Sequence, residues 1–112
     1  MSKIKHLGEN YLRFDSSIYD IIDCQAPVFT CANNYADFES LKDTEAMTYD
    51  FNLSKLKFEV FDYGFRFGDH PQRMFFVPCY SRQNGWYNPD VDVYFRGEKV
   101  LSNIEGEIEY GF

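Results

Sequence analysis

The second half of the chain alternates apolar and polar residues, a pattern that predicts β-strands. In residues 56–69 (LKFEVFDYGFRFGD) the apolar side chains stand at even positions up to Val60 and at odd positions from Phe61 onward. A bulge at this change would keep them on one face of a single long strand, and a strand buried on both faces is the alternative. Residues 73–81 (RMFFVPCYS) predict the next strand, in which Pro78 indicates an edge or a bulge.

Three further segments predict strands. Residues 47–53 (MTYDFNL) alternate, and residues 91–95 (VDVYF) and 99–104 (KVLSNI) flank a turn, which predicts a hairpin. The inward-facing residues of its first strand are Val91, Val93 and Phe95. The chain ends in SNIEGEIEYGF, which predicts a last strand that closes the sheet. Its solvent face would carry carboxylates about 7 Å apart, because alternate strand residues are two steps of about 3.3 Å apart; these residues are Glu105, Glu107 and Glu109.

Two segments of the first half predict helices. Residues 16–23 (SSIYDIID) begin with a serine that can cap a helix, and their apolar residues follow the i, i+3, i+4 spacing. Because isoleucine and tyrosine also favour strands, a strand is the alternative. The second helix is expected from about residue 35 to 43, with Asn34 as its cap and Asp37 as the capping partner. Its apolar face would carry Tyr35, Phe38 and Leu41.

These elements together predict an α+β fold. We expect an antiparallel β-sheet of about five strands, with one or two short helices packed on one face. A chain of 112 residues without a linker or a repeat indicates a single domain over residues 1–112. Aromatic residues make up 20% of the chain, which is enough for a well-filled core.

Composition also bears on where the protein works. No apolar run is long enough to span a membrane, and the N-terminus lacks the apolar region of a signal peptide. The cysteines are odd in number, which disfavours a disulfide framework and indicates buried free thiols in a reducing compartment; they are Cys24, Cys31 and Cys79. The expected localisation is therefore cytoplasmic, with no membrane partner.

Negative charge is concentrated in one part of the sequence. The chain has 18 acidic and 11 basic residues, a net charge of −7, and this balance excludes direct binding to nucleic acid. Between residues 15 and 50 the only basic residue is Lys42. The acidic residues there are Asp15, Asp20, Asp23, Asp37, Glu39, Asp43, Glu45 and Asp50. We expect these carboxylates and the terminal glutamates to form one exposed negative face, with surface solubility as the simpler explanation.

Candidate chemistry is sparse. His70 stands beside Asp69 and near Arg73, and with Tyr80 these residues define the one candidate for a small enzyme or ligand binder; a plain turn is the alternative. A set of Asp20, Asp23 and Cys24 lacks the spacing of a known metal site. The sequence therefore predicts no enzyme, no metal and no cofactor.

The predicted function follows from the charge. A folded protein can present carboxylates at the spacing of nucleic-acid phosphates and so occupy the basic groove of a nucleic-acid-handling protein. Small acidic proteins of phages and mobile elements that disarm nucleases or CRISPR effectors offer an analogy of size and charge. The predicted partner-binding residues are Asp37, Glu39, Asp43, Glu45, Trp86, Tyr87, Glu105, Glu107 and Glu109.

The alternative is an immunity protein or complex subunit that recognises one partner through aromatic residues. Its binding patch would include Trp86, Tyr87 and Tyr94. The first two lie in the turn-rich segment QNGWYNPD and either anchor a partner or fold back over the core.

Overall fold

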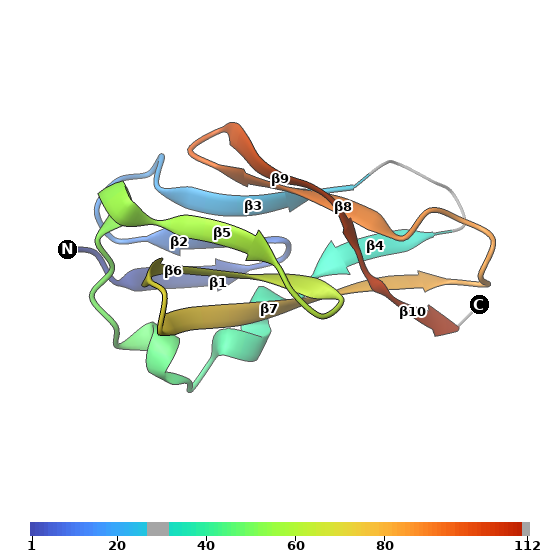
Figure 1. Cartoon of the computed structure of the whole chain (residues 1–112), viewed down its shortest axis with the longest axis horizontal. Coiled ribbons are helices and arrows are strands. Elements are labelled where there is room, and N and C mark those ends of the chain that lie inside the picture. Colours follow the sequence, from blue (N-terminus) through green and yellow to red (C-terminus); the bar gives the residue numbers. More distant parts are fainter. Residues whose placement is uncertain (27–31, 111–112) are drawn as a thin grey trace.

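The strands of this computed structural model form two sheets whose inner faces share one core (Figure 1). The structure describes residues 1–26 and 32–110. The first sheet has the order β1-β2-β3-β8-β9, and each strand in it runs antiparallel to its neighbours. Its strands are β1 Ile4–Gly8, β2 Tyr11–Phe14, β3 Ile21–Gln25, β8 Asp90–Phe95 and β9 Glu98–Glu105.

The second sheet is centred on the longest strand, β7. Its order is β10-β7-β6-β5, and β4 also pairs with β7. The strands are β4 Asn33–Ala36, β5 Lys57–Val60, β6 Gly64–His70, β7 Arg73–Gln83 and β10 Glu107–Tyr110. β10 lies parallel to β7, whereas the other pairs of this sheet are antiparallel. Short 3-10 helices complete the chain: η1 Phe38–Leu41, η2 Glu45–Met47 and η3 Leu53–Lys55.

Large aromatic rings fill the space between the sheets. Phe51 is fully buried, and its ring lies 5.4 Å from Phe14 of the first sheet and 5.6 Å from Phe67 of the second (centroid to centroid). Tyr49 and Phe75 pack on the same ring, at 4.7 and 5.4 Å. The residues around Phe51 therefore join the two sheets into one core, because each large ring removes about 150–250 Å² from water.

The predicted α+β fold is wrong. Strands make up 58% of the structure and helical turns 10%, in two sheets, and the described residues contain no helix of seven or more residues. Residues 16–20 form a turn, followed by β3, in which Ile22 and Cys24 are buried on alternate positions. The strand alternative for this segment is the correct one from Ile21 onward. The i, i+3, i+4 spacing misled because isoleucines that alternate on a strand can also fit helical positions.

The second predicted helix is also wrong for most of its length. Asn34 and Tyr35 lie in β4, and only residues 38–41 form a single 3-10 turn. Its cap, Asp37, makes no side-chain capping bond. The turn still buries Phe38 and Leu41, so the apolar spacing located the correct inward side chains but not their backbone conformation.

Two strand predictions need correction. Residues 47–53 contain no named strand; η2 and η3 flank an isolated bridge between Phe51 and Ser2. Residues 56–69 form the hairpin β5–β6, not one bulged strand. The chain reverses at Asp62 and Tyr63, whose φ angles are 39° and 56°. The apolar side chains change from even to odd positions just before this turn.

The strand β7 and the hairpin β8–β9 are confirmed. Arg96 and Gly97 form the hairpin turn with φ angles of 53° and 80°, and Val91 and Val93 are buried, while Phe95 is partly buried against the core. Pro78 lies inside the sheet, where β7 exchanges the partner β6 for β4. The Pro78 carbonyl accepts a hydrogen bond from the Asp37 N–H. Because proline has no N–H, no backbone donor is left unpaired at this position of the sheet.

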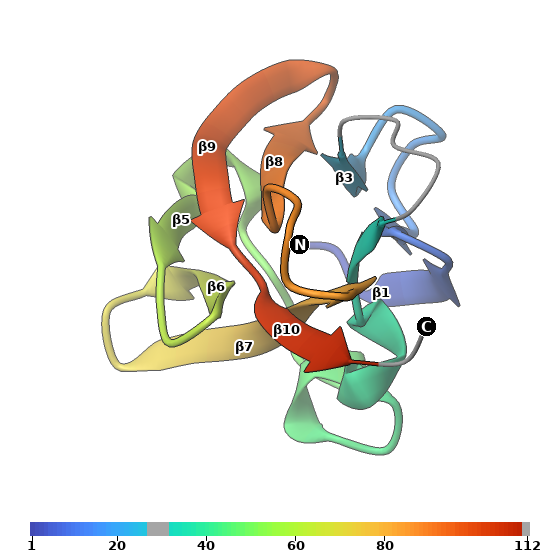
Figure 2. The ribbon, with the colours of Figure 1, turned by 90° about the vertical axis from the view of Figure 1, so that its right-hand side faces the viewer.

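The predicted terminal strand is two strands in different sheets. β9 ends at Glu105, buried Gly106 follows, and β10 begins at Glu107 (Figure 2). A Cβ at Gly106 would lie 3.0 Å from the Tyr80 carbonyl carbon, so this position suits glycine as the chain crosses from one sheet to the other. The molecule measures 42 × 24 × 21 Å, and none of its described helices has the length and apolarity needed to cross a membrane.

Candidate functional site

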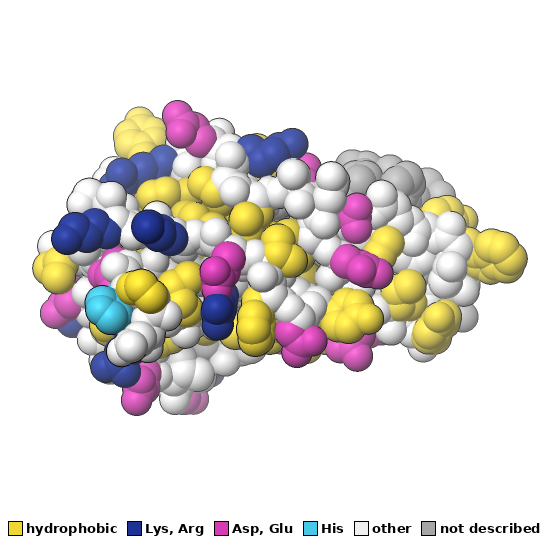
Figure 3. All heavy atoms as spheres, viewed as in Figure 1, with side chains coloured by type: hydrophobic (Ala, Val, Ile, Leu, Met, Phe, Trp, Pro, Cys, Tyr) yellow, Lys and Arg dark blue, Asp and Glu magenta, His cyan; other side chains and the backbone are white. Residues whose placement is uncertain are grey.

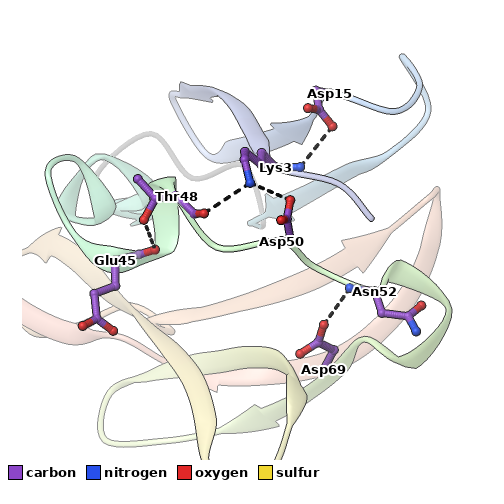
Figure 4. A network of polar contacts seen from close by, with 7 residues as sticks. All are labelled: Lys3, Asp15, Glu45, Thr48, Asp50, Asn52 and Asp69. Carbon is purple, nitrogen blue, oxygen red and sulfur yellow. Dashed lines mark hydrogen bonds and ion pairs between the residues drawn. The ribbon is translucent and has the colours of Figure 1, made fainter.

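The acidic residues of positions 15–50 do not share one face. Three of them form ion pairs: Asp20 with Arg96 at 2.7 Å, Glu45 with Arg73 at 2.9 Å and Asp50 with Lys3 at 2.6 Å. Figure 4 shows the Lys3 ammonium between Asp50 and the Thr48 carbonyl, while the Lys3 backbone N–H donates to Asp15. The expectation of a single negative face is therefore wrong for this segment, because part of its charge is neutralised within the molecule.

Asp20 is the most embedded of these carboxylates. It is 5% exposed and accepts hydrogen bonds from the Ser16 hydroxyl and the Arg96 guanidinium. Burial alone would raise the pKa of Asp20, but the two hydrogen bonds and the positive charge of Arg96 outweigh it and lower this pKa. Asp20 thus joins the turn before β3 to the hairpin turn, which is a structural role.

A smaller group of carboxylates does converge, on the outer face of β4, β7 and β10. Tyr80 of β7 stands opposite Tyr35 of β4 on one side and Glu107 of β10 on the other. Because side chains two residues apart share a face, Glu109 lies on this face too, and Asp37 follows Tyr35 at the end of β4. We call Asp37, Glu107 and Glu109 the acidic patch.

The carboxylates of the acidic patch lie close enough to Tyr35 and Tyr80 to raise the pKa of both. The Tyr35 hydroxyl donates a 2.7 Å hydrogen bond to Glu109 Oε1. Burial, this hydrogen bond and the charges of Glu109 and Asp37 raise the pKa of Tyr35 to about 12, against an opposing effect of Arg82. Burial and the charges of Asp37, Glu107 and Glu109 also raise the pKa of Tyr80. All three carboxylates of the acidic patch therefore raise the pKa of the same residue, Tyr80.

A hollow adjoins the acidic patch. It has a volume of about 340 Å³ and is lined by Glu9, Asp37, Glu39 and Tyr35, with Arg82 as its cation. The structure thus brings Glu39 next to Asp37, as the sequence predicted, and adds Glu9 from the loop after β1.

Exposed aromatic rings lie at the same end of the molecule. Trp86 is 83% exposed and Tyr110 is 76% exposed. A Cβ at Gly85, the residue before Trp86, would lie 3.1 Å from the Tyr110 ring, which places the loop 84–89 beside β10. We call Trp86 and Tyr110 the aromatic tip. Tyr110 is the last residue of β10, which is an edge strand of the second sheet.

A buried polar network holds this loop, and the sequence analysis missed it. The Asn34 amide donates to the carbonyls of Asn88 and Asp90, at 2.7 and 3.1 Å. Its oxygen accepts from the Ser81 hydroxyl, which in turn accepts from Gln83, while the Gln83 oxygen accepts from the Tyr87 N–H at 2.7 Å. Three buried polar residues on alternating inward positions of adjacent strands were the available clue.

The remaining predicted binding residues lie elsewhere. Asp43 is exposed in the turn after η1, Glu45 pairs with Arg73 at the start of β7, and Glu105 is exposed at the end of β9. Tyr87 is partly buried in the loop. Tyr94 lies on the first sheet, with the Lys99 ammonium 5.8 Å from its ring centre, and not with Trp86.

Asp69, His70 and Arg73 of the predicted His70 centre line one hollow, but the hydrogen bonds of Asp69 are made with other residues. Both carboxylate oxygens of Asp69 are occupied, by the Tyr49 hydroxyl and the Asn52 N–H, each at 2.6 Å (Figure 4 shows the second contact). His70 Nδ1 accepts a hydrogen bond from the Gln72 N–H. Tyr80 stands seven residues after Arg73 on one strand, about 23 Å away at about 3.3 Å per residue.

The described thiols are buried, and the carboxylates of the candidate metal set have other partners. Cys24 and Cys79 are free and buried, as expected, and burial raises the pKa of both; Cys31 lies outside the described residues. Asp20 is engaged with Arg96, and Asp23 accepts from Gln25. Within residues 1–26 and 32–110, no group of three His, Cys, Asp or Glu residues could hold a metal ion.

Comparison with known proteins adds no relative. The chain matched no protein-family model, no curated protein and no solved structure. The candidate site therefore rests on its own geometry: an acidic patch and an aromatic tip at one end of a two-sheet β-protein.

Proposed function

We propose that this protein is a non-enzymatic binding protein that docks its acidic patch and aromatic tip onto a basic surface of a nucleic-acid-handling protein. The observation that carries the proposal is the convergence of Glu107 and Glu109 of β10 and Asp37, the residue after β4, around Tyr80 of β7. Glu107 and Glu109 are alternate residues of β10, about 7 Å apart, which is close to the phosphate spacing of a nucleic-acid strand.

In this proposal the carboxylates increase the rate of association, and the exposed aromatic rings contribute most of the binding energy. Carboxylates accelerate the encounter with a basic groove in a salt-dependent manner. Exposed Trp and Tyr side chains are enriched among the residues that dominate binding energy, and Trp86 and Tyr110 stand at the same end as the carboxylates. In the face shown by Figure 3, the charged side chains toward the right-hand end, where β10 and the loop 84–89 lie in Figure 1, are acidic.

Matched charge reversals test the proposal. Tagged protein is used to capture partners from a host lysate at low and high salt, and the captured protein is then purified and its nucleic-acid binding measured with and without this chain. We expect the variant Asp37→Lys/Glu107→Lys/Glu109→Lys to lose capture and competition. The control Glu45→Lys/Glu98→Lys/Glu105→Lys makes the same change in net charge at other sites and should retain both. Equal behaviour of the two variants contradicts a localised site.

The exposure of Trp86 supports a second candidate, an immunity protein or complex subunit that binds mainly through its aromatic residues. In that case Trp86→Ala would weaken binding more than the triple reversal. Affinity would also change little between low and high salt, so one salt titration with both variants separates the two functions.

A further inference from the structure

A second concave site lies far from the acidic patch, at the start of β7. It is a groove of about 660 Å³ on the outer face of β5, β6 and β7. In β6, the side chains of Phe65 and Phe67 face the core, so Arg66 and Gly68 face outward. Figure 3 shows most of the Lys and Arg side chains of this face, and a His, toward the left-hand end, where Asp and Glu side chains lie among them.

Gly68 creates the hollow. It pairs with Lys57 of β5, and Met74 of β7 lies on its other side. A Cβ at Gly68 would lie 2.4 Å from the Arg73 carbonyl oxygen and 2.9 Å from Met74 Sδ, so no larger residue fits without a shift. Across β5, β6 and β7, the position between the side chains of Lys57 and Met74 is therefore empty, because Gly68 has no side chain. Met74, which is partly buried, adds apolar surface to the groove. Phe58 stands opposite Phe67, and its ring faces the core, 5.6 Å from the Phe95 ring (centroid to centroid).

The rim of the groove carries cationic side chains, and its two carboxylates form an ion pair or hydrogen bonds with other residues of the protein. Lys55, Lys57 and His70 line the groove and are exposed. Glu59 pairs with Arg66, and both oxygens of Asp69 accept hydrogen bonds from Tyr49 and Asn52. Over the described part of the chain, no carboxylate oxygen lies within 4.0 Å of the Lys55 or Lys57 ammonium.

His70 adds a donor. Because its Nδ1 accepts from the Gln72 N–H at 3.1 Å, the proton of the neutral ring is on Nε2, which can donate to an anion. We propose that this groove binds a small aromatic anion, with the ring against Gly68 and Met74 and the anionic group on Lys55 and Lys57. This site is independent of the protein surface proposed above, and neither its success nor its failure affects that proposal.

A pair of fluorescent probes tests the site. 8-Anilinonaphthalene-1-sulfonate carries the required ring and anion, and N-phenyl-1-naphthylamine is its analogue without the sulfonate. We expect saturable binding of the sulfonate to the wild-type protein and weaker binding of the neutral analogue. Lys55→Ala/Lys57→Ala should weaken sulfonate binding about tenfold, because two charge-assisted contacts are lost.

Three controls make the result decisive. Lys5→Ala/Lys42→Ala removes two exposed lysines that do not line the groove and should leave the affinity unchanged. Trp86→Ala tests whether the dye binds at the aromatic tip instead. The far-ultraviolet circular dichroism of each variant confirms folding. The proposal is overturned if saturable binding is absent, if the neutral analogue binds equally well, or if Trp86→Ala rather than the groove variant abolishes binding.

Discussion

Single residues at the acidic patch are coupled by charge. Tyr35 is held neutral by burial and by its hydrogen bond to Glu109, and Tyr80 experiences three carboxylates at once. These interactions join β4 to β10 across β7. The patch thus combines negative charge with aromatic rings, in a part of the molecule where strand pairing, and not flexible loops, positions most of the side chains.

The titration of Tyr35 tests this coupling. Its pKa of about 12 lies above the ordinary value of 10, so the neutral form stabilises the folded state below pH 10. This stabilisation is lost as the pH rises from 10 toward 12. Glu109→Gln should lower the pKa of Tyr35 by about 1, because one negative charge is removed while burial remains. Carbon-13 NMR of labelled tyrosines measures it, Glu105→Gln is the control, and an unchanged Tyr35 pKa in Glu109→Gln would contradict the contact.

Cysteine reactivity tests the core at the same scale. Burial raises the pKa of Cys79 to about 12 and raises that of Cys24 as well, so both thiols are protonated and shielded at pH 8. In a Cys31→Ser background, 5,5′-dithiobis(2-nitrobenzoic acid) should label neither thiol in the native protein and both in guanidinium chloride. Rapid labelling under native conditions would show that the core opens at one of them.

Individual elements take their form from what they pack against. Residues 16–25 have helical spacing, but β2 and β8 on either side draw residues 21–25 into the sheet. The terminal segment alternates as one strand would, yet Gly106 divides it between two sheets. Local periodicity therefore indicated which side chains face inward, and it failed where the identity of the element depended on its neighbours.

The loop 84–89, which carries the exposed Trp86, is held by the buried network around Asn34. Asn34→Ala would remove the acceptor of the Ser81 hydroxyl and the side-chain donor to the carbonyls of Asn88 and Asp90. The free energy of unfolding should fall by about 2 kcal/mol, since each unsatisfied buried polar group costs about 1–3 kcal/mol. Asn33→Ala, on the exposed face of the same strand, should change it by less than about 0.5 kcal/mol. Urea denaturation followed by circular dichroism compares the two, and similar losses would argue against the network.

Across the whole molecule, one aromatic core holds two sheets together, and the acidic patch and the cationic groove lie at different ends of the long axis. The acidic patch and the aromatic tip lie at one end, and the cationic groove lies at the other. The net charge of −7 does not show this separation, because several acids are neutralised by internal ion pairs. The two sites that we propose therefore differ in the sign of their charge.

Phe51 tests the union of the sheets. Its ring contacts both of them, so Phe51→Ala should lower the free energy of unfolding by about 4 kcal/mol, a large part of the 5–15 kcal/mol typical of a domain. Phe61, which is 45% exposed, is the matched control, and Phe61→Ala should cost less than about 1 kcal/mol. Guanidinium denaturation of both variants gives the comparison. A small effect at Phe51 would mean that the sheets are held together elsewhere.

The sequence by itself determined the β-rich second half, the β8–β9 hairpin with its inward-facing Val91 and Val93, and the acidic character of the protein. These properties depend on side-chain periodicity, turn residues and composition, all of which are local. Only the tertiary structure decided that there are two sheets, that β10 runs parallel to β7, and which carboxylates meet and which are neutralised. The physical reason is that pairing between strands joins residues far apart in the chain, such as Tyr35 and Glu109, and no local pattern encodes that choice of partner.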